Sequence, residues 1–223
     1  MAAYDLEEQE QIANAKAFWQ QYGNLITGAV VVAAVGVGGY FGWQGYQNRQ
    51  AAEASAIYGV LAQAAEAKDS AKVKAAAGEL VEKYSGTGYA PMGALVAGKM
   101  LFDSGDLKSA RAQLTWASEH GSSELRDVAR LRLAAVLLDD KAYDEALKAL
   151  EPAPAEGFAA RFAELKGDVL LAQGKSAEAR SAYQDALAKL GAEKAGEGSS
   201  VAAQAAGPYK DLLQQKLDAL GGA

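Results

Sequence analysis

The chain has 223 residues, a formal net charge of −6 and no cysteine. Without cysteine there can be no disulfide, no thiol catalysis, no thiolate metal site and no lipid anchor on cysteine. Lys and Arg are spread along the chain and form no cluster that would neutralise phosphates, so we predict no nucleic-acid binding. Four prolines, abundant Ala and Leu, and few β-branched residues after Val37 indicate an all-α protein.

A charge-free segment near the N-terminus, Ala17–Asn48, predicts a membrane span. Its apolar part covers residues 23–47, and about 20 such residues are enough to cross a hydrocarbon core as a helix. Tyr and Trp rings prefer the depth of the lipid headgroups, and clusters of both flank the apolar part about one bilayer thickness apart. We therefore predict a short segment over residues 1–22, a transmembrane helix over 23–47 and one domain over 48–223. The predicted membrane-interface residues are Trp19 and Tyr22 at one end, and Tyr40, Trp43 and Tyr46 at the other.

Two other interpretations of the apolar segment are weaker. A buried helix of a soluble domain is usually shorter and has a polar face, which this segment lacks. A cleaved signal peptide needs a basic region before its apolar part and small residues at the cleavage site. Here acidic residues precede the segment, with Lys16 as the one base among them, and bulky aromatic residues follow it.

Orientation in the membrane is not encoded by charge. The positive-inside rule counts Lys and Arg near the ends of a span, and acidic residues contribute little to it. Lys16 on one side and Arg49 on the other make this comparison nearly a tie. The distribution of Lys and Arg therefore does not determine on which side of the membrane residues 48–223 lie.

The rest of the chain contains an internal repeat. Three segments align without gaps from Gly98, Ala134 and Gly167, with starts 36 and 33 residues apart. In each segment a leucine precedes a turn, and after the turn a small residue is followed four positions later by a large one. The leucines are Leu101, Leu137 and Leu170; the turn residues are Gly105, Lys141 and Gly174; the small residues are Ala110, Ala146 and Ala179; the large ones are Leu114, Leu150 and Tyr183; and Ala117, Ala153 and Ala186 close the units.

This order of residues predicts a helical hairpin, in which small residues let two helices approach and large side chains fill the space beside them. The period resembles that of the tetratricopeptide repeat. Lys141 stands where a turn glycine is usual, so the repeats are degenerate. A fourth, weaker unit precedes the three, with helices over about 50–68 and 70–84. We predict a loop over 191–207, followed by a helix from Pro208 that caps the end of the array.

Catalytic chemistry is not apparent in the sequence. His120 is the one histidine, and it is followed by Gly121, which favours a place at a helix C-terminus. The acid pairs Asp103/Asp106 and Asp139/Asp140 suit turns and helix caps better than acid–base catalysis or calcium binding. No glycine-rich phosphate loop occurs. We therefore predict no enzyme, no cofactor and no metal site.

The predicted functional surface of such an array is a groove along the inner faces of the first helix of each hairpin. The alternative for its large apolar members is burial in the core between helices, and the sequence leaves both open. The basic clamp with which some repeats grip a C-terminal carboxylate is not evident. The candidate groove residues are Leu95, Lys99, Phe102, Leu131, Leu138, Glu164 and Asp168, with Ala135 and Leu171 in the same register.

The whole layout resembles the ancillary subunit of the bacterial SecYEG translocon, of the YfgM type. The resemblance covers nearly the full chain and is most specific in EEQEQI…W…YGN over Glu7–Asn24 and in YSGTGYA over Tyr84–Ala90. It implies an inner-membrane anchor with a short cytoplasmic N-terminus and a periplasmic repeat domain. It also implies association with SecYEG and with a membrane-anchored chaperone of the PpiD type.

The leading functional hypothesis is therefore a non-enzymatic adaptor that assists the handover and folding of translocated, still unfolded polypeptides. The alternative is a membrane-tethered regulator that sequesters a signalling protein through the repeat groove. An enzyme of unknown type is disfavoured because no catalytic constellation is visible.

Overall fold

The computed structural model describes residues 2–196 and 200–221, and every regular element within those ranges is helical. The chain divides into two compact units, Met1–Gln50 and Ala51–Ala223. Helix α1 (Ala2–Glu66) supplies the first unit and also the first helix of the second. The predicted all-α class with an apolar N-terminal helix is confirmed.

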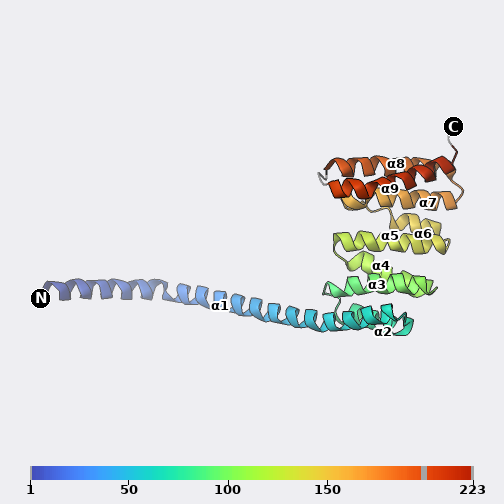
Figure 1. The fold of residues 1–223 in the computed structure, drawn as a ribbon. Helices are drawn as coiled ribbons and strands as arrows, with labels where there is room; N and C mark the ends of the chain where they lie inside the picture. The colour runs from blue at the N-terminus through green and yellow to red at the C-terminus, as the bar shows by residue number, and fades with distance from the viewer. Residues whose placement is uncertain (1, 197–199, 222–223) are drawn as a thin grey trace. The chain divides into compact units, whose positions relative to one another are not determined.

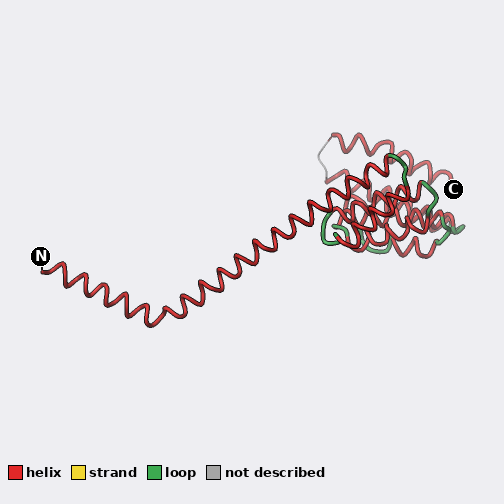
Figure 2. The backbone as a smooth tube through the Cα atoms, turned by 90° about the horizontal axis from the view of Figure 1, so that it is seen from below, coloured by secondary structure: helices red, strands yellow, loops and turns green. Residues whose placement is uncertain are grey.

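The second unit is a stack of helical hairpins, which Figure 1 shows layer on layer. The last turns of α1 pack on α2, α3 on α4, α5 on α6 and α7 on α8, while α9 lies against α7 and α8. The connecting loops lie at the ends of the helices (Figure 2). The bounds are α2 Ser70–Lys83, α3 Tyr89–Asp103, α4 Leu107–His120, α5 Ser123–Asp139, α6 Tyr143–Ala149, η1 Glu156–Phe158, α7 Ala159–Ala172, α8 Ser176–Gly196 and α9 Ser200–Ala219.

The first helix of every hairpin ends with the same backbone motif. One residue adopts a left-handed conformation, and the next N–H donates to the carbonyl five residues earlier, which satisfies a helix-end acceptor. The motif also occurs at Lys68, so the weaker unit over residues 50–84 is in register with the three clear repeats. The left-handed residues are Lys68 (φ 55), Gly105 (φ 84), Lys141 (φ 59) and Gly174 (φ 79), and the hydrogen bonds run from Asp69, Asp106, Ala142 and Lys175 to Ala64, Leu101, Leu137 and Leu170.

In two hairpins, a glycine of the first helix faces a large side chain of the second. A Cβ on Gly98 would lie 2.6 Å from Leu114 Cδ2, and one on Gly167 would lie 2.5 Å from Tyr183 Cε1. The small residues that begin the second helices, Ala110, Ala146 and Ala179, are fully buried. The predicted small-to-large packing is therefore confirmed, and the helices approach as closely as these residues allow.

Capping side chains start the second helices of two hairpins. Asp69 accepts a hydrogen bond from the Lys72 N–H (3.1 Å), and Asp106 accepts one from the Ser109 N–H (3.0 Å). The Ser109 hydrogen bonds and Lys74 lower the pKa of Asp106 to about 2. The prediction that the acids at the turns serve as caps holds for Asp106.

One repeat is shorter than the sequence predicts. The second helix of the third hairpin, α6, ends at Ala149, and Ala153 is exposed in the segment beyond it. Pro152 explains the early end, because proline lacks an N–H and disfavours helical geometry at the residue before it. The predicted closing residue Ala153 therefore lies outside α6, whereas Ala117 and Ala186 lie inside α4 and α8.

The C-terminal region is also more helical than predicted. Helix α8 continues to Gly196 and α9 begins at Ser200, so most of the loop predicted over 191–207 is helix; residues 197–199 lie outside the described residues. The segment is rich in alanine, the strongest helix former, and its glycines did not outweigh that preference. Pro208 lies inside α9 rather than at its start.

We predict that Gly167→Ala lowers the stability of the repeat unit. The added methyl meets the Tyr183 ring, and overpacking of this kind costs about 1–3 kcal/mol. Gly78→Ala is the matched control, because its Cβ would have nothing within 4 Å and alanine favours the helix by about 0.5–1 kcal/mol. Urea unfolding of the full chain in detergent, followed by circular dichroism, measures both. Equal effects of the two changes would contradict the packing argument.

We predict that Lys141→Gly stabilises the protein by about 0.5–1 kcal/mol, since a left-handed conformation is strained for residues with a Cβ. Gly174→Lys at the equivalent turn should have the opposite effect. The same unfolding measurement applies. A loss of stability in Lys141→Gly would mean that the lysine side chain contributes more than the strain costs.

Candidate functional site: membrane anchor and partner-binding groove

The N-terminal unit has the properties of a membrane span. Helix α1 is long and apolar enough to cross a bilayer, and none of its most apolar window is buried. Val32 and Val35 are about 70% exposed along the helix (72% and 70%). A helix that exposes apolar side chains on all sides is suited to lipid rather than to water.

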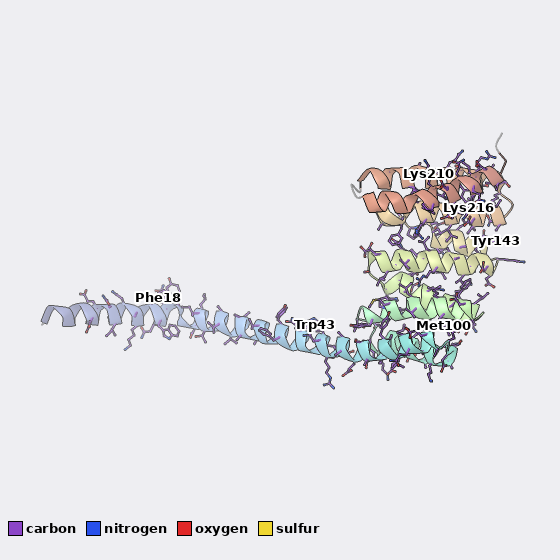
Figure 3. All side chains as sticks on the ribbon, viewed as in Figure 1. Phe18, Trp43, Met100, Tyr143, Lys210 and Lys216 are labelled. Atoms are coloured by element: carbon purple, nitrogen blue, oxygen red, sulfur yellow. The ribbon has the colours of Figure 1, made fainter. Side chains whose placement is uncertain are left out.

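The predicted interface residues lie exposed at both ends of the apolar segment. Tyr22 and Tyr40 are 18 positions apart, which is about 27 Å along a helix, close to the roughly 30 Å of a hydrocarbon core. Figure 3 shows the labelled side chains of Phe18 and Trp43 projecting from α1. The spacing and exposure of the predicted interface residues suit the depth of the lipid headgroups. Their role at the membrane interface remains a prediction. The exposed set comprises Trp19, Tyr22, Tyr40, Trp43 and Tyr46.

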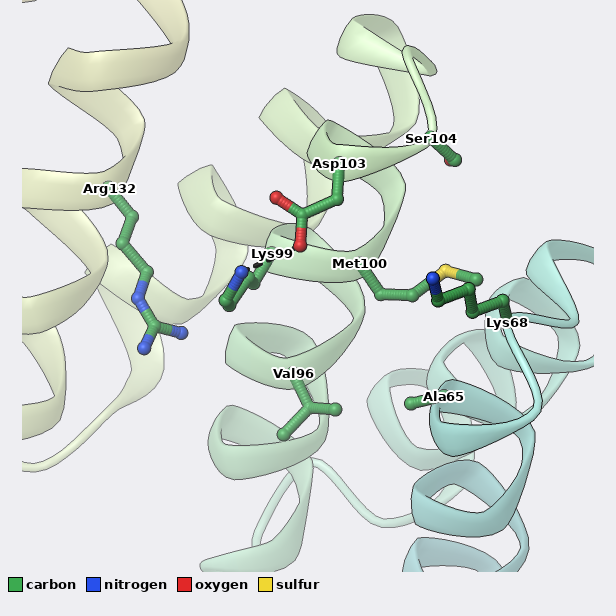
Figure 4. A pocket seen from close by; sticks show the side chains of 8 residues that line it. All are labelled: Ala65, Lys68, Val96, Lys99, Met100, Asp103, Ser104 and Arg132. Carbon is green, nitrogen blue, oxygen red and sulfur yellow. Dashed lines mark hydrogen bonds and ion pairs between the residues drawn. The ribbon is translucent and has the colours of Figure 1, made fainter.

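The repeat unit has a groove along its first helices, at the end of α1 and on α3 and α5. Two adjoining cavities of about 460 and 270 Å³ share Lys99, Asp103 and Arg132 (Figure 4). We call this continuous surface the trough. It is lined by Ala65 and Lys68 of α1 and its turn, by Val96, Gly98, Lys99, Met100, Phe102, Asp103 and Ser104 of α3 and its turn, by Leu114 of α4, and by Arg132, Ala135 and Val136 of α5.

The charges of the trough are mainly positive. Lys99 pairs with Asp103 (Nζ–Oδ2 2.6 Å) within α3, and Arg132 reaches across from α5 to donate to the Leu95 carbonyl (3.0 Å). Among the described residues, neither Arg132 nor Lys68 forms an ion pair with a carboxylate. The structure thus gathers three basic side chains from three segments around one apolar floor.

The predicted groove residues fall into three environments. Lys99 and Phe102 line the trough, as does Ala135. Leu95 is buried, and Leu131 and Leu138 are half-buried against the central core. Glu164 and Asp168 of α7 contact the C-terminal helix instead of the trough. Binding of a partner by this set remains a prediction.

Comparison with known proteins places this arrangement in a family. A family model described as a tetratricopeptide repeat-like domain matches residues 16–222. An ancillary SecYEG translocon subunit from Neisseria gonorrhoeae is 35% identical over 99% of this chain and 100% of that protein. The chain belongs to this family. Proteins with the same name from Haemophilus influenzae (35% identity, 82% of this chain and 90% of that protein) and Escherichia coli (31%, 79% and 85%) also match.

The family resemblance inferred from the sequence is therefore confirmed, together with its tetratricopeptide-like repeats. No solved structure matches the chain. Within the part of the chain that the structure describes, no three His, Asp or Glu side chains converge as metal ligands. His120 ends α4, where its ring stacks on Trp116 at 4.4 Å and Nδ1 lies 2.9 Å from the Trp116 carbonyl.

The C-terminal helix of this family member is held by a cluster of polar groups. Lys216 of α9 binds Glu164 (2.7 Å) and Asp168 (2.8 Å), both on α7. Tyr209 donates to Glu164, and Tyr183 donates to Asp168, each at 2.7 Å. Beside this cluster Leu213 is fully buried among alanines of α7 and α8. The predicted cap is confirmed: α9 covers the end of the array.

The electrostatics of the cluster favour the pairing. Burial raises the pKa of Tyr183, and the Asp168 carboxylate raises it further, so the phenol stays a donor. Burial lowers the pKa of Lys216, but hydrogen bonds to Asp168 and Glu164 outweigh it, and the net pKa is raised. The cation is therefore retained between the two carboxylates.

Lys68, Val96, Met100 and Arg132 line the trough but are absent from the groove predicted from the sequence. Val96 and Arg132 occupy equivalent repeat positions, one residue beyond the predicted Leu95 and Leu131. One residue corresponds to about 100° around a helix, so Leu95 points into the core while Val96 faces the trough. The repeat alignment contained a signal for this difference. Arg132 is equivalent to Val96, and an arginine at that repeat position indicates that the position faces solvent and not the core.

We predict that Lys216→Met weakens the docking of α9 by about 1–3 kcal/mol, because two half-buried carboxylates lose their cation. Lys210→Met on the same helix is the control, since Lys210 is exposed and has no ion-pair partner among the described residues. Hydrogen exchange of α9 in the full chain measures the effect. If both variants exchange alike, the cluster does not hold the cap.

Proposed function

We propose that this chain is a non-catalytic, membrane-anchored ancillary component of the SecYEG translocon in the bacterial inner membrane. In this proposal residues 1–22 are cytoplasmic, residues 23–47 span the bilayer, and residues 48–223 form the periplasmic interaction domain. The observation that carries the proposal is the relative named ancillary SecYEG translocon subunit that matches this chain from end to end. A match of that extent includes both the apolar helix and the hairpin array.

We further propose that the repeat unit associates with a chaperone of the PpiD type and assists the handover of unfolded polypeptides as they leave the translocon. Hairpin arrays bind partners on the surface made by successive first helices. The trough lies on that surface and offers an apolar floor with charges around it. Lys99 and Phe102 are the predicted groove residues that line it, and we assign them the contact with the partner.

Topology is the first test of this proposal, and the absence of native cysteine makes it clean. Ser176→Cys lies exposed at the start of α8, and Ala13→Cys lies exposed near the N-terminus. In intact spheroplasts a membrane-impermeant thiol reagent should label Ser176→Cys, whereas Ala13→Cys should react only after lysis. The reverse pattern would place the repeats in the cytoplasm and favour the regulator that sequesters a signalling protein.

Affinity purification from solubilised membranes is the second test. We expect the translocon subunits and a membrane-anchored chaperone to copurify with the full chain. A variant with residues 24–47 replaced by an unrelated span separates the contacts. Loss of the translocon with retention of the chaperone would place the translocon contact in the membrane and the chaperone contact in the repeats. Absence of the translocon from the unaltered protein would refute the proposal.

A further inference from the structure

We infer that the trough binds an acidic amphipathic segment of a partner protein, with its apolar side chains on the floor and its carboxylates at Arg132 and Lys68. This inference rests on the proposed function of the repeat unit as an interaction module, and it specifies the chemistry of the partner. It goes beyond the groove expected from the repeats, because the residues that select the ligand come from three separate segments.

Charge is the first argument. The lining of the trough has three cationic side chains, Lys68, Lys99 and Arg132, and one carboxylate, Asp103. The whole chain carries a net charge of −6, so a positive trough departs from the rest of the molecule. Potentials of opposite sign steer partners and select among them, so the trough disfavours basic segments and favours acidic ones.

The availability of those charges is the second argument. Asp103 neutralises Lys99 at 2.6 Å, which leaves Arg132 and Lys68 as the cations without a carboxylate among the described residues. Arg132 uses Nη1 to donate to the Leu95 carbonyl, and this bond holds the guanidinium in the trough. An arginine fixed in this way presents its remaining N–H groups in a fork that matches a carboxylate.

The floor supplies the third argument. Val96 and Met100 are half-buried on α3, between Lys68 on one side and Arg132 on the other (Figure 4). Methionine is flexible and polarisable, so it adapts to apolar side chains of different shapes. An apolar strip flanked by cations fits a segment whose apolar residues lie on one face with acids beside them.

The probe is a fluorescent, N-acetylated and C-amidated peptide of Glu and Leu in an amphipathic repeat, added to the full chain in nanodiscs. Anionic lipids repel this peptide, and empty nanodiscs correct for residual partitioning. We expect saturable binding that weakens as salt is raised. A matched peptide with Gln in place of Glu should bind at least tenfold more weakly.

Two variants locate the site. Lys68→Asn removes a charge at a left-handed position that asparagine tolerates, and Arg132→Met removes the guanidinium. Each should weaken binding about fivefold, as expected for the loss of a partly exposed charge pair. Lys141→Asn is the matched control, because it removes the same charge at the same left-handed turn position outside the trough. Its affinity should equal that of the unaltered chain.

Several outcomes would overturn the inference. Equal binding of the Gln peptide, an equal loss in Lys141→Asn, or binding that requires a free C-terminal carboxylate would each do so. Copurification of the translocon with the Lys68→Asn and Arg132→Met variants separates this inference from the proposed function. Failure of the peptide to bind while the translocon copurifies refutes the acidic ligand alone, and loss of the translocon from the unaltered chain refutes the function itself.

Discussion

The close approach of two helices in each hairpin is the constraint on which the rest of the repeat unit depends. Glycine faces leucine in one hairpin (Gly98 and Leu114) and tyrosine in another (Gly167 and Tyr183), and no additional atom fits between them. These contacts set the distance between α3 and α4 and between α7 and α8. Because each layer then stacks on the next, the end of α1, α3 and α5 come to lie side by side and form the trough. The trough is thus a consequence of this packing, and Gly98 and Leu114 themselves form part of its lining.

Apolar side chains are removed from water in different ways in the two units of the chain. In the repeat unit leucine, valine and alanine are removed from water by neighbouring helices, and Leu61, Leu80 and Leu114 are fully buried. In the N-terminal unit comparable side chains remain exposed on all sides of α1. Only lipid or another apolar protein surface makes the second arrangement favourable. The same residue types therefore build a core in one unit and a membrane anchor in the other.

Much of the fold could be predicted because its signals are local and repeated. The turn residues at Gly105 and Gly174 and the small-to-large pairs recur in register, so three weak patterns reinforce one another. The length of α6 was missed because the repeat alignment outweighed Pro152, although a single proline is enough to end a helix. The trough could be predicted only in part. Its cations are far apart in sequence, and a shift of one residue along a helix decides whether Leu95 or Val96 faces the trough.

One of the residues that line the trough, Lys68, lies at a turn with a strained left-handed backbone conformation. Glycine adopts this conformation without cost, yet lysine occupies it at two of the four equivalent turns, Lys68 and Lys141. A residue with a Cβ at such a position costs about 1–2 kcal/mol, and strain of this size is often found at binding sites. Lys68 lines the trough, where a glycine would leave Arg132 as the one cation without a carboxylate among the described trough residues. At that turn the strain places a charge where a ligand would meet it, whereas nothing in the structure explains the lysine at Lys141. The repeat thus tolerates the same local cost at both turns, but only at Lys68 does the side chain contribute to the surface that we propose binds a partner.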